Sequence, residues 1–172
     1  MYYEGFCQYF IIVISSFQYM KNNSIDSIKL EKHLTKDIHD QHVNGSLTVV
    51  WRDWDKIIED IPKMIYVTTV EPGEIKGPHL HLKRNSYFTC IRGKVVFIAK
   101  DESGNYLELE SSEDEPVLVQ IPHGFASAHV NVNNEKSTVL TIADLAWKPD
   151  DNEMQNVSFD DYDWNKWKKI KT

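Results

Sequence analysis

Two histidines, His79 and His81, are the residues of this chain whose types and spacing could most directly do chemistry. They end the stretch Glu71–His81, whose letters are EPGEIKGPHLH. Side chains two apart on a β-strand point to the same face of the sheet, so a strand here would hold both imidazoles side by side. Paired imidazoles can bind a transition metal, and one imidazole that titrates near neutrality can act as a general base. The stretch therefore predicts a metal site or a proton-transfer site.

The segments around this pair have the pattern of many short strands. Runs of β-branched and aromatic residues alternate with turn residues at spacings of roughly 8–12 residues, which indicates an all-β sandwich or barrel and not a parallel α/β sheet. We expect one domain over residues 20–172, a length that can bury its own core. The expected strands are Met64–Val70, Ser86–Ile91, Lys94–Lys100, Tyr106–Leu109, Val117–Ile121, Ala128–Val132 and Thr138–Leu145.

Outside these strands the pattern is less regular. Trp54–Ile61 has the apolar spacing of a helix that Pro62 would end after about two turns. The other expected elements are a weak strand at Ser27–Leu34, a turn at Asn44-Gly45, a β-rich segment at Leu47–Trp51, an exposed acidic loop at Ser111–Pro116 and a short helix or clamp at Asn165–Lys171.

Composition argues against several classes of function. A formal net charge of −7 and a pI of about 5.5 argue against nucleic-acid binding, which depends on clustered Lys and Arg. The two cysteines, Cys7 and Cys90, offer no disulfide framework and favour a reducing, cytoplasmic compartment. The apolar run Tyr9–Ile14 is too short to span a bilayer, and no basic residue precedes it. We expect residues 1–19 to be an extension, either disordered, from an upstream gene-model start, or an edge strand used in dimerisation.

The histidine pair and a later turn together resemble the two cupin motifs. Gly73, the His79–His81 pair, Ser86 and Gly93 follow the spacing of the first motif, and Pro122-His123-Gly124 with Ser127 follows the second. The resemblance implies a double-stranded β-helix barrel, or jelly roll, with short peripheral helices. Metal-binding cupins carry Glu and His where this chain has Ser86 and Ser127. Two imidazoles alone seldom hold a metal, and His129 falls two residues late, so we expect no metal or other cofactor.

A narrower resemblance covers residues 64–164. The segment Ile121–Ala126 and the tail from Trp147 through Glu153 to Trp164 are similar to the dTDP-4-dehydrorhamnose 3,5-epimerases. Lys76–His81 instead resembles the Arg-Gly-x-His-Ala-His motif of the related sugar 3,4-ketoisomerases, with Lys for Arg. Both groups are RmlC-like cupins that act on nucleotide-linked 4-keto-6-deoxy sugars. The resemblance therefore implies a nucleotide-diphosphate sugar as substrate, a cytoplasmic enzyme and a homodimer that pairs through N-terminal strands.

The resemblance also implies roles for four catalytic candidates. His79 matches the base that removes a proton next to the ketone, and His81 matches a proton shuttle or a sugar-binding donor. Tyr66 lies where ketoisomerases keep an active-site tyrosine, and Asp161 matches the carboxylate that pairs with the base. Thr141 stands where 3,5-epimerases carry their proton-donating tyrosine. Ala146 stands at a substrate-lining tyrosine, and Phe88 falls near an expected lysine.

Further residues are candidates for substrate binding. Lys76, Lys83 and Arg84 could contact a diphosphate at the barrel mouth, or form a solvated basic patch. The remaining candidates are Ser86, Ser127, His129 and Trp147. We expect a metal-independent epimerase at C3, or at C3 and C5, serving glycan or O-antigen synthesis. The alternatives are a 3,4-ketoisomerase of the same substrates, a non-catalytic sugar-binding cupin and, from a different chemistry, a metal-dependent cupin enzyme.

Overall fold

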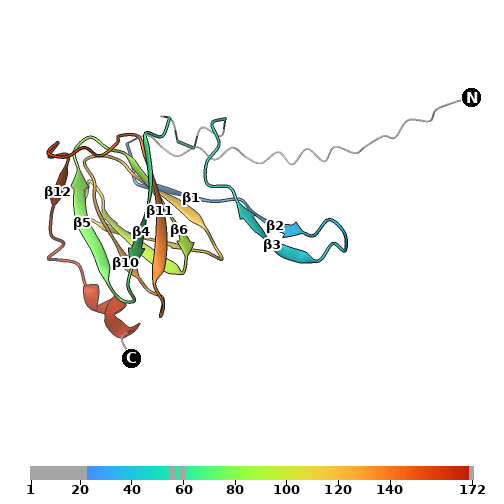
Figure 1. Cartoon of the computed structure of the whole chain (residues 1–172). Helices are drawn as coiled ribbons and strands as arrows, with labels where there is room; N and C mark the ends of the chain where they lie inside the picture. Colours follow the sequence, from blue (N-terminus) through green and yellow to red (C-terminus); the bar gives the residue numbers. More distant parts are fainter. Residues whose placement is uncertain (1–22, 55–56, 59–60, 171–172) are drawn as a thin grey trace, which may run out of the picture.

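Alternating apolar residues build a molecule of short antiparallel strands (Figure 1). The structure is a computed structural model, which describes residues 23–54, 57–58 and 61–170. Its strands are β1 (Asp26–Lys29), β2 (Lys32–Lys36), β3 (Val43–Thr48), β4 (Met64–Val70), β5 (Ile75–His81), β6 (Ser86–Arg92), β7 (Lys94–Lys100), β8 (Tyr106–Ser112), β9 (Val117–Ile121), β10 (Ala126–Asn131), β11 (Ser137–Ala143) and β12 (Met154–Asn156), and a 3-10 helix, η1 (Trp164–Ile170), follows.

Two five-stranded sheets face each other. The β4 sheet has the strand order β1-β9-β6-β11-β4, and the β5 sheet has the order β12-β5-β10-β7-β8. The chain crosses repeatedly from one sheet to the other, which is the connectivity of a jelly roll. The all-β, cupin-type fold predicted from the sequence is thereby confirmed. No helix in the described part of the chain is long and apolar enough to cross a membrane.

Alternate residues of these strands fill the space between the sheets. Phe97, Val119 and Val139 are almost fully buried there together with Cys90. Burial raises the pKa of the Cys90 thiol to about 11, so this cysteine is a packing residue and not a nucleophile. The core residues of this cluster are on β6, β7, β9 and β11. The candidate site lies where β4 and β5 face each other.

Segments outside the two sheets pack on the outer face of each sheet. Phe159 and Tyr162 of the C-terminal tail pack on Val96 and Ile98 of the β5 sheet, and η1 follows them (Figure 1). Leu30 and Ile58 pack in the same way on Tyr87, Leu118 and Ile142 of the β4 sheet. The sequence predicts a short helix or a clamp at Asn165–Lys171, and the structure has the short helix η1 there, with Trp167 packed against the same cluster as Phe159 and Tyr162.

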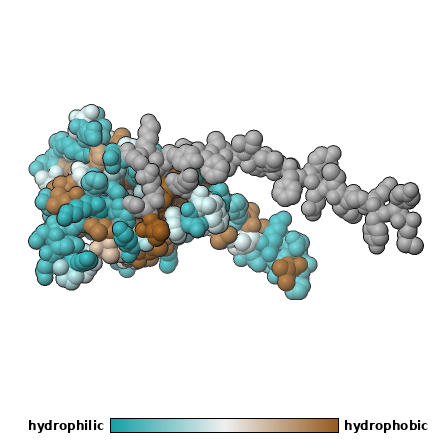
Figure 2. Space-filling model, turned by 90° about the horizontal axis from the view of Figure 1, so that it is seen from above, coloured by the Kyte–Doolittle hydropathy of each residue, from teal (hydrophilic) through white to brown (hydrophobic). Residues whose placement is uncertain are grey.

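The hairpin of β2 and β3 projects away from the barrel (Figures 1 and 2). Its strands are exposed along almost their whole length. The expected turn at Asn44-Gly45 is wrong, because both residues lie inside β3 and the hairpin turns earlier, at residues 37–42. There the Asp37 carboxylate accepts the N–H of His39 at 2.8 Å, which fixes the turn.

Two other expectations have different outcomes. The acidic segment begins inside β8, where the Ser111 hydroxyl is buried and donates to the carbonyl of Val117 at 2.9 Å. Only the later part of that segment is an exposed loop. Residues 1–19 lie outside the described residues, as do parts of the expected Trp54–Ile61 helix.

A β-bulge in β5 sets which side chains face the barrel interior. Ser127 of β10 pairs with His79, but the next interior residue of β10, His129, pairs with Lys76. Gly77 and Pro78 therefore stand together opposite Ala128. The extra residue turns Lys76 to the same face as His79 and His81. A regular strand would have pointed it outward.

Gly77 makes this bulge possible. Its φ is +90°, and a Cβ added there would lie 2.8 Å from the carbonyl oxygen of Ser127. We expect Gly77→Ala to lower the free energy of unfolding by about 2–5 kcal/mol, measured by urea unfolding, because backbone strain adds to the overlap. Gly104→Ala is the matched control: its φ is +84° but its nearest neighbour is 3.9 Å away. It should lose only about 1–2 kcal/mol. Equal losses in the two variants would contradict the packing account.

Candidate active site

A cavity of about 220 Å³ lies between the two sheets, beside the bulge of β5. Most of its wall comes from β4, β5 and β10, and single residues of neighbouring elements complete it. The lining residues are Tyr66, Thr68, Phe88 and Thr141 from the β4 sheet, Lys76, His79, His81, Ser127, His129 and Met154 from the β5 sheet, and Arg84 from the loop between β5 and β6.

His79 is oriented by a residue of the short strand β12. Asn156 pairs with His79 in the sheet, and its Oδ1 lies 3.0 Å from Nδ1 of the imidazole. Because an amide oxygen only accepts, this hydrogen bond assigns the ring proton to Nδ1. The other nitrogen, Nε2, then carries a free lone pair. That is the tautomer a general base requires.

His81 has partners on both ring nitrogens. Its Nδ1 donates to Oε2 of Glu153 at 2.9 Å. Nη2 of Arg84 lies 2.7 Å from Nε2 and 3.1 Å from Nδ1, and Nε2 is the nitrogen that accepts from it. Burial and the neighbouring guanidinium lower the pKa of His81, against the opposing effect of Glu153. The ring is therefore held neutral, and no nitrogen of it is left to take a proton from a substrate.

Glu153 is the buried carboxylate of the site. Burial opposes its ionisation, but the hydrogen bond from His81 and those from the N–H groups of Lys83 and Arg84 hold the pKa of Glu153 below its ordinary value. Glu153 is only 6% exposed. The carboxylate thus stays charged and ties the tail to the loop after β5.

His129 packs against the rings of Phe88 and Phe97, whose centroids are 6.4 and 5.6 Å from its own and 5.6 Å from each other. Its Nε2 is buried and has no hydrogen-bond partner among the described residues. Burial, with the charge of Lys76 and the nearby His79, lowers the pKa of His129 to about 4. His129 is therefore a neutral imidazole at physiological pH.

Other polar atoms of the cavity wall also lack partners among the described residues. They include the hydroxyls of Thr68 and Thr141, on β4 and β11. Buried polar groups are nearly always hydrogen-bonded, and each unsatisfied one costs about 1–3 kcal/mol. These unpartnered polar atoms line one cavity, so a polar ligand or water bound there could form the missing hydrogen bonds.

The structure brings most of the predicted site residues together. Tyr66, Lys76 and Ser127 line the cavity with the histidines, and Tyr66 is on the wall across from them. Arg84 also lines it, but as a buried side chain and not at the mouth. Ser86 is buried on β6 without lining the cavity, and the side chain of Lys83 is exposed outside it.

Two predicted site residues are placed elsewhere. Asp161 is exposed on the tail that covers the outer face of the β5 sheet, where its carboxylate binds Lys100 and Tyr106. It does not pair with His79, because that face is the opposite side of the sheet from the cavity. Trp147 is 63% exposed and does not line the cavity.

Sequence reasoning missed the partners of the histidines. Asn156 and Met154 lie in a three-residue strand, too short for an alternation pattern to reveal. Glu153 was noted as part of a motif, but nothing in the spacing indicated that it would bind His81. The available signal was the resemblance of the tail to the epimerases, whose motif includes Glu153.

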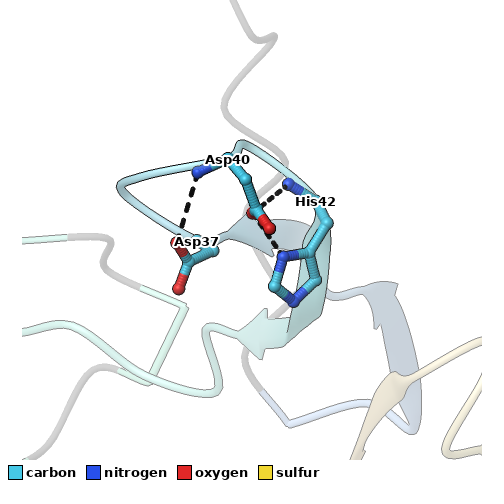
Figure 3. Close-up of side chains that lie close together, drawn as sticks. All are labelled: Asp37, Asp40 and His42. Carbon is cyan, nitrogen blue, oxygen red and sulfur yellow. Dashed lines mark hydrogen bonds and ion pairs between the residues drawn. The ribbon is translucent and has the colours of Figure 1, made fainter.

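One group of three potential metal ligands occurs among the described residues, and it is not in the cavity. Asp37, Asp40 and His42 lie on the exposed turn of the β2–β3 hairpin (Figure 3). Hydrogen bonds within the turn already account for their proximity: Asp40 accepts from the N–H and ring of His42, and Asp37 from the N–H of Asp40. We assign no metal to this turn.

The fold and the cavity define a cupin-type jelly roll with an imidazole-lined site. The sequence matches the family described as WxcM-like, C-terminal (FdtA) over residues 11–163, so the chain belongs to this family. It is also 24% identical over 151 residues to the spore coat polysaccharide biosynthesis protein SpsL of Bacillus subtilis (strain 168), covering 82% of this chain and 97% of SpsL. The resemblance to RmlC-like cupins stated above is thereby confirmed.

Solved structures share the fold. A dTDP sugar isomerase from Desulfovibrio desulfuricans G20 superposes with a TM-score of 0.72 at 15% identity, covering 83% of this chain and 92% of its own. The 3'-monoepimerase ChmJ from Streptomyces bikiniensis, in complex with dTDP-quinovose, gives 0.64 at 14% identity, covering 78% and 69%. The capsular polysaccharide assembling protein CapF from Staphylococcus aureus gives 0.54 at 22% identity. There the match covers 58% of this chain but only 29% of CapF.

The buried imidazole of His129 predicts a pH dependence of stability. In the unfolded chain this group gains a proton below pH 6.5, but in the folded chain only below about pH 4. The unfolded state therefore binds more protons in this window, and the free energy of unfolding should fall by up to about 3 kcal/mol as the pH drops through it. Urea unfolding at several pH values should show a shallower fall for His129→Gln. An unchanged pH profile in that variant would contradict the assignment.

Proposed function

We propose that this chain is a metal-independent isomerase of a nucleotide-linked 4-keto-6-deoxy sugar, with His79 as the base. The observation that carries this proposal is the hydrogen bond from Nδ1 of His79 to Asn156, which leaves Nε2 as the proton acceptor at the cavity. A hydrogen next to a ketone is acidic enough for an oriented imidazole to remove it. The 4-keto group of such a sugar activates the hydrogen on C3 in this way.

The arrangement of the cavity supports 3,4-ketoisomerisation as its reaction. All three imidazoles come from the β5 sheet, so they lie on one wall. A ketoisomerase can move a proton between neighbouring carbons from one side, whereas epimerisation at C3 needs an acid on the opposite face of the sugar. Thr141 stands where the 3,5-epimerases have their tyrosine, which argues against epimerisation at both C3 and C5.

Epimerisation at C3 alone, the reaction expected first from the sequence, is the second candidate. Tyr66 favours it, because this phenol lies on the wall across from His79 and could return a proton to the other face. The names of similar proteins support both readings: one solved structure is a dTDP sugar isomerase and another is a 3'-monoepimerase. SpsL is named for spore coat polysaccharide biosynthesis, which supports a role in glycan synthesis.

Incubation with a dTDP-linked 4-keto-6-deoxyglucose in D2O, followed by NMR, tests this proposal. A ketoisomerase should give a 3-keto product with deuterium at C4, and a C3 epimerase should give a 4-keto product with deuterium at C3. His79→Asn should lower the rate by at least about 100-fold, because the base is gone. His123→Asn, which changes an exposed imidazole, should keep full activity. If the wild type binds the sugar but incorporates no deuterium, the proposed reaction is wrong and the alternative of a non-catalytic sugar-binding cupin is supported.

We also propose that the chain forms a homodimer through its β2–β3 hairpin. A two-stranded hairpin alone is marginally stable in water, and Leu34 and Leu47 of this one are 69% and 56% exposed. Strand β4 is an edge of its sheet, with Ile65 and Val67 exposed on its outer face. The hairpin of a second copy, paired with this edge, would cover both surfaces.

Light scattering after gel filtration tests the assembly. The wild type should have the mass of a dimer, and Val67→Lys should shift it to the monomer, because a charge would be buried at the new interface. Thermal unfolding of the variant would show that its barrel remains folded. A monomeric wild type at micromolar concentration would contradict this proposal and leave the proposed reaction unaffected.

A further inference from the structure

Arg84 is a buried cation in the wall of the cavity. Its side chain is 7% exposed, and Arg84 and Glu153 are the buried charged residues among those that the structure describes. A cation removed from water is costly unless a negative group or several acceptors surround it. The contacts of this guanidinium therefore indicate what it is built to bind.

The contacts of Arg84 leave its charge incompletely matched. One nitrogen, Nη2, donates to the neutral ring of His81 at 2.7 Å. The nearest approach to Glu153 is 3.9 Å from Nε, and Nε makes no hydrogen bond among the described residues. The carboxylate of Glu153 is already engaged by His81 and by two backbone N–H groups. What this position lacks is a negatively charged oxygen on the cavity side.

We propose that Arg84 stabilises the negative oxygen that forms during the reaction, and that His81 is a positioning residue for Arg84. This inference rests on the proposed function. As Nε2 of His79 takes the proton from C3, the electrons of the broken C–H bond form a C3–C4 double bond. The electrons of the C4 carbonyl then move onto its oxygen. Arg84 is the donor that meets this enolate oxygen in a cavity of low dielectric.

This assignment changes the roles of two residues. Arg84 is too deeply buried for a diphosphate at the mouth, where the exposed Lys76 is better placed. His81 is not a proton shuttle, because Glu153 holds one of its nitrogens and Arg84 the other. The chain Glu153–His81–Arg84 instead fixes the guanidinium against the cavity.

Steady-state kinetics of Arg84→Gln test the proposal against Arg92→Gln, the same change at an exposed arginine at the end of β6. Loss of an oxyanion donor should lower kcat by roughly 100- to 1,000-fold, with little change in the affinity for dTDP. Arg92→Gln should behave as the wild type. If the wild type itself gives no exchange, the proposed function and this inference fail together. If the wild type is active and Arg84→Gln is equally active, this inference alone fails.

Two further measurements separate a chemical role from a loss of folding. Millimolar guanidinium ion should restore part of the activity of Arg84→Ala, because the free cation can occupy the same space. It should have no such effect on His79→Asn. The double variant His81→Asn/Arg84→Gln should be no slower than Arg84→Gln, since His81 acts through Arg84. Absence of rescue in a folded Arg84→Ala, or additive losses in the double variant, would overturn the assignment.

Discussion

The hydrogen bond between His81 and Glu153 is the interaction on which the rest of the site depends. Glu153 comes from the tail, 72 residues beyond His81 in sequence. Its carbonyl also accepts the N–H of Leu82 at 2.9 Å, and the next residues pair with β5 as strand β12. The same short pairing brings Asn156 to His79. The pairing of this tail segment with β5 therefore sets the tautomer of His79 and places a carboxylate beside His81.

The bulge in β5 is the second constraint, and it acts on the side chains themselves. Without the extra residue, Lys76 would point to the outer face, where the tail packs. With it, a cation and two imidazoles share the interior face of one strand. Burial is the main cause of the lowered pKa of His129, and the charge of Lys76 lowers that pKa further. The bulge in the backbone therefore changes the charges that line the cavity.

The sequence predicted the strands around the site closely, because residues in β4, β7 and β9 alternate or cluster with clear turn residues at their ends. It also placed His79 and His81 correctly on one face. It could not predict the bulge, since a register shift depends on the partner strand and not on local pattern. Asp161 and Glu153 show the same limit. Both are carboxylates of a polar tail, and only its path over the barrel decides which one reaches an imidazole.

The contacts of the two motif histidines also bear on the metal chemistry of cupins. A metal needs lone pairs of several ligands directed at one point. In this cavity Arg84 occupies Nε2 of His81 and Glu153 occupies Nδ1, while Ser127 replaces the imidazole that would close the set. The ring nitrogens left without a hydrogen bond among the described residues are Nε2 of His79 and the buried Nε2 of His129. Two imidazole nitrogens that belong to different strands, opposite the phenol of Tyr66, do not make a metal-ligand set, and they agree with the proposed proton transfer, in which Arg84 is the cation of the site.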